Sequence, residues 1–268
     1  MIPEAFIEEW KSNAPWQTLA MVEQDMIISR ALIEIYNHPE INKLLVFRGG
    51  TALNKLYINP PSRYSEDIDL VQIKAEPIGK TIDAVRSVLD SWLGKPSRKQ
   101  TERSTKLIYK FASVDSIPAK LKIEINTTEH FYVQELKIMN LSMNSEWFTG
   151  TTKIFTYTLE ELIATKLRAL YQRRKGRDLF DLWLVIKQNR IDINQMISIF
   201  EKYCKYNNQS ITRALFEQNL LEKRNHRDFS TDINSLLALE EKWNYMEAFE
   251  IIDKEIINKL KDKPWKDS

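Results

Sequence analysis

The chain of 268 residues is poor in the residue types that mark secreted, membrane-spanning and linker-rich proteins. Its single cysteine, Cys204, excludes an intramolecular disulfide and fits a reducing compartment. Its six glycines form no glycine-rich run, which argues against long flexible linkers. No stretch approaches the roughly 18 apolar residues of a membrane span. Residues 1–15 carry acids where a signal peptide needs basic residues, so we expect a cytoplasmic protein without membrane contact.

The histidines and the net charge of the chain say little about its function. The three histidines lie far apart without the spacing of metal ligands, so we assign them no role. A net charge of +2 decides little by itself. One local run is strongly basic, and it is either a solvated helix end or a phosphate-facing patch. It contains six basic residues and no acid: Lys166, Arg168, Arg173, Arg174, Lys175 and Arg177.

The apolar pattern changes near residues 140–157, where we expect a boundary between two parts. The first part alternates helical and strand periods, and the second is helical throughout, so we predict an α+β fold divided into residues 1–150 and 151–268. The expected strands are 44–48, 67–73, 106–112 and 121–126. The expected helices are 1–37, 51–57, 79–93, 158–173, 178–188, 192–205, 208–222 and 231–262, the last with a possible break.

The segment from Phe47 to Leu70, FRGGTALNKLYINPPSRYSEDIDL, holds the strongest chemical signal. Gly49 and Gly50 open an expected helix, and without a Cβ they allow the backbone to approach a phosphate closely. Asp67 and Asp69 alternate within a strand pattern, so both carboxylates leave the same face. Two carboxylates side by side favour a bound cation such as Mg²⁺. A phosphate cradle beside metal-binding acids indicates nucleotide chemistry.

A third carboxylate follows in the segment LKIEIN, residues 121–126. Its alternation places Lys122, Glu124 and Asn126 on one face of a strand. If this strand lies beside the Asp67–Asp69 strand, Glu124 joins the two aspartates, and three carboxylates can hold two metal ions for phosphoryl transfer. The simpler interpretation is a half-exposed strand with a polar face. The Gly-Gly-Thr and Asp-x-Asp motifs upstream favour the functional interpretation.

Lys166 interrupts an apolar stripe on the expected helix 158–173, which Thr158 and Glu161 begin as a capping box. A lysine there either extends its ammonium to solvent or meets an anion, because burying an unpaired charge is costly. We expect the anion to be a nucleotide phosphate. Asp178 and Asp181 follow at the start of the next helix, where one of them suits the helix N-terminus. The sequence leaves open which of them orients Lys166 or a metal-bound water.

The loop between the glycine pair and the acids offers two further candidates. Arg63 could meet a triphosphate, although a loop arginine is commonly only solvated. Ser65, two residues before Asp67, could cap a turn or contact a phosphate.

These motifs together resemble the AbiEii/AbiGii nucleotidyltransferase-like toxins of the polymerase-β-type nucleotidyltransferase superfamily. The resemblance rests on Gly-Gly-Thr-Ala-Leu, Arg-x-Ser-x-Asp-Ile-Asp-Leu, Lys-Ile-Glu-Ile-Asn and Ala-Thr-Lys…Arg-Asp-Leu-x-Asp-Leu, in that order over residues 40–185. It implies a mixed sheet flanked by helices, a Mg²⁺ (or Mn²⁺) site and an NTP substrate. It also implies a cognate antitoxin encoded nearby and, as in some relatives, a tRNA acceptor.

The family motifs transfer to single positions of this chain. The resemblance implies phosphate binding by Gly49, Gly50 and Thr51, metal binding by Asp67, Asp69 and Glu124, and catalytic or nucleotide-binding roles for Lys166 and Asp178. The fifteen residues between Thr51 and Asp67 exceed the shorter gap that is usual in the wider superfamily.

Two other functions stay open on the sequence. The same residues suit a kinase-like transfer of a phosphoryl or nucleotidyl group to a protein or small molecule. A non-catalytic nucleotide-binding partner protein is the other alternative, but it would not need Asp67, Asp69, Glu124 and Lys166 all to be intact.

Overall fold

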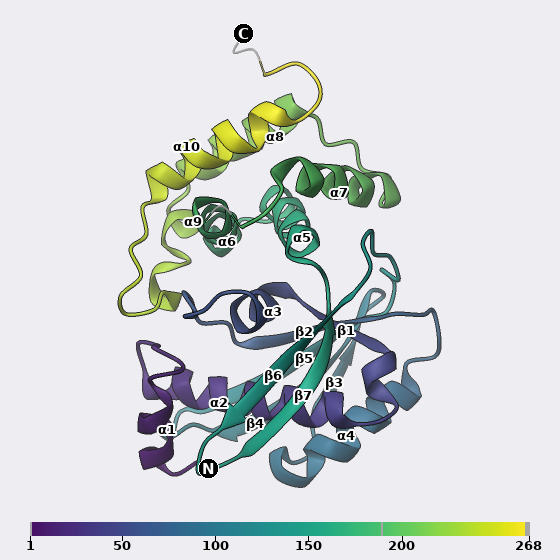
Figure 1. Cartoon of the computed structure of the whole chain (residues 1–268), viewed down its shortest axis with the longest axis vertical. Helices are drawn as coiled ribbons and strands as arrows, with labels where there is room; N and C mark the ends of the chain where they lie inside the picture. Colours follow the sequence, from purple (N-terminus) through teal and green to yellow (C-terminus); the bar gives the residue numbers. More distant parts are fainter. Residues whose placement is uncertain (1, 189, 266–268) are drawn as a thin grey trace. The chain divides into compact units, whose positions relative to one another are not determined.

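A computed structural model describes residues 2–188 and 190–265 of the chain (Figure 1). The chain divides into two compact units. The first comprises Met1–Tyr157 with Leu237–Leu239, and the second comprises Thr158–Leu236 with Glu240–Ser268. Among the described helices, none combines the length and apolar character that crossing a membrane requires.

The first unit is built on a mixed sheet, which the described residues form from seven strands in the order β3-β4-β5-β2-β1-β7-β6. The β1–β7 and β2–β5 pairs are parallel, and the other neighbours are antiparallel. The strands are β1 (Leu45–Arg48), β2 (Asp67–Gln72), β3 (Ser97–Gln100), β4 (Ser104–Ala112), β5 (Pro118–Asn126), β6 (Lys137–Asn144) and β7 (Thr149–Thr156).

Helices cover one face of this sheet and form the core of the first unit. α2 packs against β6 and β7, and α4 packs against β4 (Figure 1). The strand residues on this covered face are apolar and buried, as Leu107, Ile123 and Phe47 illustrate. The helices of the unit are α1 (Glu4–Trp10), α2 (Leu19–Asn37), α3 (Gly49–Leu56) and α4 (Gly79–Leu93), with a 3₁₀ turn η1 at Ile41–Lys43.

The second unit is helical. Its first helices pack against each other through buried apolar faces, and Phe180, Trp183 and Trp243 form an aromatic cluster with ring centroids 5.1–5.7 Å apart. The helices are α5 (Leu159–Gln172), α6 (Gly176–Lys187), α7 (Ile193–Tyr206), α8 (Arg213–Arg224), α9 (Arg227–Thr231) and α10 (Tyr245–Glu255), with 3₁₀ turns η2 (Asn234–Leu236) and η3 (Ile257–Lys259).

The predicted α+β class, a mixed sheet followed by a helical second half, is confirmed. The predicted strand and helix periods reappear within a few residues for β1, β2, β4, β5 and for α3 to α7. Thr158 is the N-cap of α5 as predicted, and its hydroxyl accepts a hydrogen bond from the Glu161 amide at 3.2 Å.

Several elements differ from the prediction. Strands β3, β6 and β7 were not expected. β3 and β6 lie at the two edges of the sheet. Few of their side chains are buried, so the apolar alternation in their sequences is weak. The helix predicted over 208–222 begins only at Arg213, after the N-cap Thr212. The helix predicted over 231–262 with a possible break is shorter than expected, because Asn244 caps α10, which covers only Tyr245–Glu255.

A short segment of late sequence completes the first unit. Leu237 pairs with Arg63 in an isolated antiparallel bridge, and the Ala238 amide donates to the Ser62 carbonyl at 2.9 Å. Gln17 donates its side-chain amide to the Leu237 carbonyl at 3.1 Å. The loop between α3 and β2 is therefore held by residues far away in the chain.

Candidate active site

The register of β2 brings the predicted acids together on one face of the sheet. Asp69 lies directly opposite Glu124 of β5, and Asp67 lies opposite Lys122. Residues directly opposite each other, and residues two apart along a strand, project from the same face. Asp67, Asp69 and Glu124 therefore share a face, and Arg48 of β1 joins them opposite Asp69. The strand with Asp67 and Asp69 therefore lies beside the strand with Glu124, as expected.

Lysines balance the charge of two of these acids. The Lys122 ammonium lies 2.7 Å from Asp67 Oδ2 and 3.8 Å from Glu124 Oε2. Lys106 lies 3.0 Å from Glu124 Oε2, and the Ser104 hydroxyl donates to Glu124 Oε1 at 2.8 Å. Burial would raise the pKa of Glu124, but the bonds from Ser104 and Lys106 outweigh it and lower that pKa. Glu124 is thus held in its charged form.

The pKa of Asp69 is shifted in the opposite direction, upward. Its side chain keeps some exposed surface, yet protein atoms closely surround the carboxylate. This burial and the neighbouring Asp67 charge raise the pKa of Asp69, although Arg48 and Lys122 lower it in part. Arg48 is itself engaged by Glu129, with Nη1 2.7 Å from Oε2. The charge of Asp69 is therefore incompletely compensated by the protein.

The glycine turn lies against this carboxylate. β1 ends at Arg48 and α3 begins at Gly49, whose φ of +83° is a conformation that favours glycine. A Cβ at Gly49 would lie only 2.4 Å from Asp69 Oδ2. The Arg48 side chain does not cap α3, so amides of the first turn lack that partner. The turn and the acids form one continuous site.

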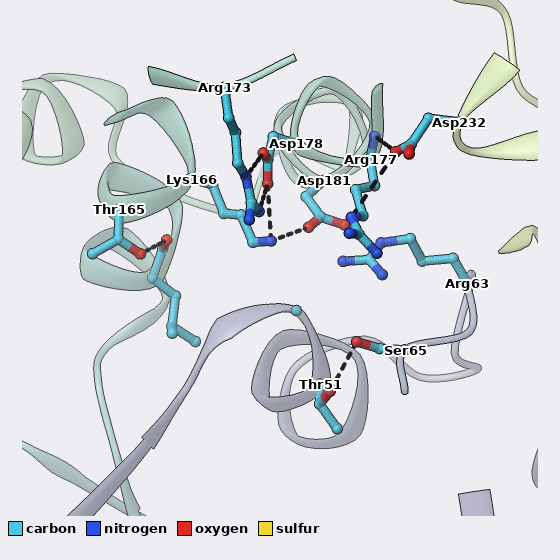
Figure 2. A network of polar contacts seen from close by, with 12 residues as sticks. Thr51, Arg63, Ser65, Thr165, Lys166, Arg173, Arg177, Asp178, Asp181 and Asp232 are labelled. Atoms are coloured by element: carbon cyan, nitrogen blue, oxygen red, sulfur yellow. Dashed lines mark hydrogen bonds and ion pairs between the residues drawn. The ribbon is translucent and has the colours of Figure 1, made fainter. Parts of the chain in front are cut away.

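The other predicted phosphate-binding residues of the first unit gather at the same turn. The Thr51 hydroxyl lies 2.8 Å from Ser65 Oγ (Figure 2). It also donates to the Asp67 carbonyl. A Cβ at Gly50 would lie 2.4 Å from Arg63 Nη2 and 3.3 Å from Ser65 Oγ. Arg63 is buried, and its Nη1 donates to the Tyr64 carbonyl at 3.0 Å. The polar groups around Gly50 thus come from the loop that precedes β2.

The second unit holds a separate buried cluster of charges. Lys166 of α5 places its ammonium 3.2 Å from Asp178 Oδ1 and 3.0 Å from Asp181 Oδ2, both of α6 (Figure 2). Arg173 forms a two-pronged pair with Asp178, at 2.7 Å from Nε and 2.9 Å from Nη2. The anion that Lys166 meets in the apolar stripe is therefore a pair of carboxylates.

Within this cluster, positive charges more than offset the burial of Asp178. Burial would raise the pKa of this carboxyl, but the charges of Lys166 and Arg173 outweigh burial and lower the pKa to about 2. Asp178 lies in the first turn of α6, where the helix dipole also favours a negative charge. Asp178 thus suits the first turn of α6 and also fixes the position of the Lys166 ammonium.

Most of the basic run after Lys166 is paired with acids. Lys175 lies 3.2 Å and Arg177 3.9 Å from Asp232, and Arg173 is paired with Asp178. This pairing reduces the positive charge that the run can offer to a phosphate.

The donor set around β2 fits a divalent cation at the two aspartates. Within residues 2–188 and 190–265, no group of three His, Cys, Asp or Glu side chains is arranged to hold a metal ion. Asp67 and Asp69 supply hard oxygen donors, and the Lys122 ammonium already lies between Asp67 and Glu124 as a positive charge. A cation beside Asp69 would lower the pKa of this carboxyl, which burial and the Asp67 charge raise. The part of Glu124 as a third ligand stays a prediction.

Sequence reasoning missed Arg48, Lys106 and Glu129 in this site. Arg48 directly precedes the glycine pair, and that adjacency was an available signal. Lys106 and Glu129 become neighbours of the acids only through strand pairing and the loop after β5.

Known proteins resemble the chain in sequence and in fold. The family described as nucleotidyl transferase AbiEii toxin, type IV TA system, matches residues 30–251, which is most of the chain. No curated protein matches the chain.

Solved structures share the fold at low sequence identity. MenT4, a nucleotidyltransferase toxin from Mycobacterium tuberculosis, superposes with a TM-score of 0.67 at 16% identity, over 97% of this chain and 91% of MenT4. JHP933 from Helicobacter pylori superposes with a TM-score of 0.51 at 19% identity, over 85% of this chain and 86% of that chain.

Proposed function

Because the chain belongs to the AbiEii family of nucleotidyltransferase toxins from type IV toxin–antitoxin systems, we propose that it transfers a nucleotide from an NTP to an RNA acceptor such as tRNA. The family makes the chain an enzyme with an NTP substrate and an antitoxin partner. The observation that carries the proposal is the shared face of Asp67, Asp69 and Glu124 beside the Gly49 turn.

We propose that Asp67 and Asp69 bind Mg²⁺ or Mn²⁺, with Glu124 as the third carboxylate. A bound divalent ion would neutralise charge on the transferring phosphate and favour attack by the acceptor hydroxyl. Lys106 and Lys122 are flexible and about a quarter exposed, at 27% and 26%, so they can release Glu124 and Asp67 toward a cation. Arg48, held by Glu129, keeps a positive charge opposite Asp69.

The turn at Gly49–Thr51 is the proposed site for the NTP phosphates. Backbone amides at the start of α3 suit an anion, and the missing Cβ atoms of Gly49 and Gly50 let the Asp69 carboxylate and the Arg63 guanidinium lie against this turn. Arg63 and Ser65, which surround Gly50, would add a charge and a hydroxyl.

We extend the proposal to the second unit through Lys166. Its ammonium would neutralise phosphate charge in the transition state, an electrostatic effect worth on the order of 3 kcal/mol. Asp178 and Asp181 hold that ammonium in a defined place, which makes both aspartates positioning residues. The reaction would take place in the cytoplasm, where NTPs and tRNA are available, and the antitoxin would be encoded nearby.

The decisive experiment compares labels on different phosphates. Purified protein is incubated with Mg²⁺, total tRNA and each NTP, labelled either on the α-phosphate or on the γ-phosphate. We expect α-label on RNA and none with the Asp69→Asn variant. The γ-label on protein or a small molecule would instead indicate kinase-like transfer, and no label on any acceptor with any NTP would favour a non-catalytic nucleotide-binding protein.

A further inference from the structure

The face of the sheet that carries the acids also carries a set of lysines, which we call the lysine face. In the register, Lys99 of β3 lies opposite Lys106 of β4, and Lys110 of β4 lies opposite Lys120 of β5. Lys106 lies opposite Glu124, and Lys122 lies opposite Asp67, so these side chains share the face of the acids. The lysine face comprises Lys99, Lys106, Lys110, Lys120 and Lys122.

The lysine face is open, in contrast to the covered face of the same strands. Along β5, Leu121, Ile123 and Ile125 are buried, whereas the residues between them keep exposed surface. β4 follows the same alternation, with Leu107 and Tyr109 buried. These lysines are therefore accessible to a large ligand.

The five lysines fall into an inner and an outer group. Lys106 and Lys122, the inner group, are paired with Glu124 and Asp67. The outer group is Lys99, Lys110 and Lys120, all exposed. For the outer group, the described part of the chain provides no carboxylate within ion-pair distance.

Two pairs of like charges directly opposite each other weaken a sheet. Lys99 faces Lys106, and Lys110 faces Lys120. Like charges directly opposite each other are destabilising, although Glu124 offsets the charge of Lys106 in the first pair. The whole chain has a net charge of only +2, so this concentration is local. An anionic ligand would relieve the repulsion.

We propose that the outer lysines bind the phosphate backbone of the nucleic-acid acceptor and lead it toward Asp67 and Asp69; this inference rests on the proposed function. The lysines extend over three strands, with spacings of roughly 5 Å across strands and 7 Å along them. A single nucleotide would meet only a few of them, whereas a polynucleotide offers repeated phosphates. Lysines contact phosphates as point charges without reading bases, so we expect binding that tolerates sequence.

The test measures RNA binding apart from catalysis. The affinity of fluorescent tRNA is measured by anisotropy, without NTP and with EDTA, at several salt concentrations. The outer-group variant carries Lys99→Gln, Lys110→Gln and Lys120→Gln. The control variant carries Lys43→Gln, Lys74→Gln and Lys80→Gln, three exposed lysines of the same unit that lie outside the lysine face. Both variants lose the same charge.

We expect the outer-group variant to bind tRNA at least about tenfold more weakly. Its plot of log affinity against log salt should lose about 2 from its slope, since each lost phosphate contact removes about 0.7. The control variant should stay close to the wild type. Unchanged binding by the outer-group variant, or an equal loss in both variants, overturns the inference.

Two further results separate this inference from the proposed function. Polyglutamate that binds the lysine face more tightly than tRNA would assign it to an acidic protein and overturn the inference. Failure of the inference alone would leave α-label transfer to RNA intact in the wild type. Failure of the proposed function would remove that transfer whatever the binding measurements show.

Discussion

Each of the two units holds a group of charged residues that lie in the family motifs. The two groups differ in how far neighbouring positive charges compensate the carboxylates. On β2, the Asp69 carboxylate has a raised pKa because burial and Asp67 outweigh its positive neighbours. Between α5 and α6, Asp178 has a pKa lowered to about 2, because Lys166 and Arg173 outweigh burial. Arg48 and Lys122 compensate the charge of Asp69 only in part, whereas Lys166 and Arg173 more than offset the burial of Asp178.

This difference separates a site prepared for a ligand from a site that already stabilises the fold. An acid whose charge is poorly compensated gains most when a cation arrives, so β2 is the expected place for metal and nucleotide. An acid held by two cations contributes to folding, because removing one partner leaves a buried charge uncompensated. The two groups should therefore respond to substitution in opposite ways.

The largest expected effect is the loss of activity in Asp69→Asn. This substitution removes a proposed metal ligand, and we expect nucleotidyl transfer to fall at least about a thousandfold, which corresponds to roughly 4 kcal/mol. The free energy of unfolding should fall by no more than about 0.5 kcal/mol, and it could rise, since the substitution removes a buried charge. Label transfer and urea unfolding measure the two quantities. A variant that retains transfer removes Asp69 from the site.

In the buried cluster, we expect substitution to destabilise the protein first. Asp178→Asn leaves the buried Lys166 without one of its two carboxylates, and Lys166→Met removes the shared ammonium. Each should lower the free energy of unfolding by about 3 kcal/mol. Urea unfolding tests this directly.

Activity in the Lys166→Met variant, measured at a temperature where it stays folded, then decides the role of the lysine. The substitution keeps most of the packing volume and removes the charge. Loss of transfer supports the proposed nucleotide contact. Full transfer in the folded variant restricts Lys166 to stabilising the helical unit.

Acid should weaken the second unit through Asp178. Its folded-state pKa of about 2 lies below the ordinary value of 3.8, so its contribution is complete above about pH 4 and is lost as pH falls through 2. The wild type should lose roughly 2 kcal/mol more than Asp178→Asn over this window. Unfolding measured between pH 5 and pH 2 checks the difference, and parallel pH curves for the two proteins would contradict it.

The smallest effects compare two glycines. Gly49→Ala forces a side chain into a positive φ and toward Asp69 Oδ2, so we expect about 1–2 kcal/mol of destabilisation and at least tenfold lower transfer. Gly79→Ala is the matched control, because nothing lies within 4 Å of its added Cβ at the start of α4. The control should retain full activity with equal or slightly higher stability. Equal activity in both variants would separate the glycine turn from the site.

Much of the fold could be predicted because its signals are local. Alternation in DIDLVQ and in LKIEIN predicts β2 and β5, and the Thr158 hydroxyl with Glu161 predicts the start of α5. The edge strands β3 and β6 could not be predicted in this way, since an edge strand buries too few side chains to produce a clear period. The possible break in the helix predicted over 231–262 could not be placed, because the cap at Asn244 interrupts a pattern that otherwise suits a helix.

The sequence by itself determined which residues are the candidates for the chemistry and on which kind of element each one lies. It placed Asp67 and Asp69 on one strand face and Lys166 on an apolar helix face, because side-chain direction follows the period of the local backbone. Only the tertiary structure decided the partners of these residues. Strand register set Glu124 opposite Asp69, helix packing set Asp178 and Asp181 against Lys166, and Leu237 joined Arg63 from far along the chain. Such contacts depend on pairing between distant segments, which no local period encodes.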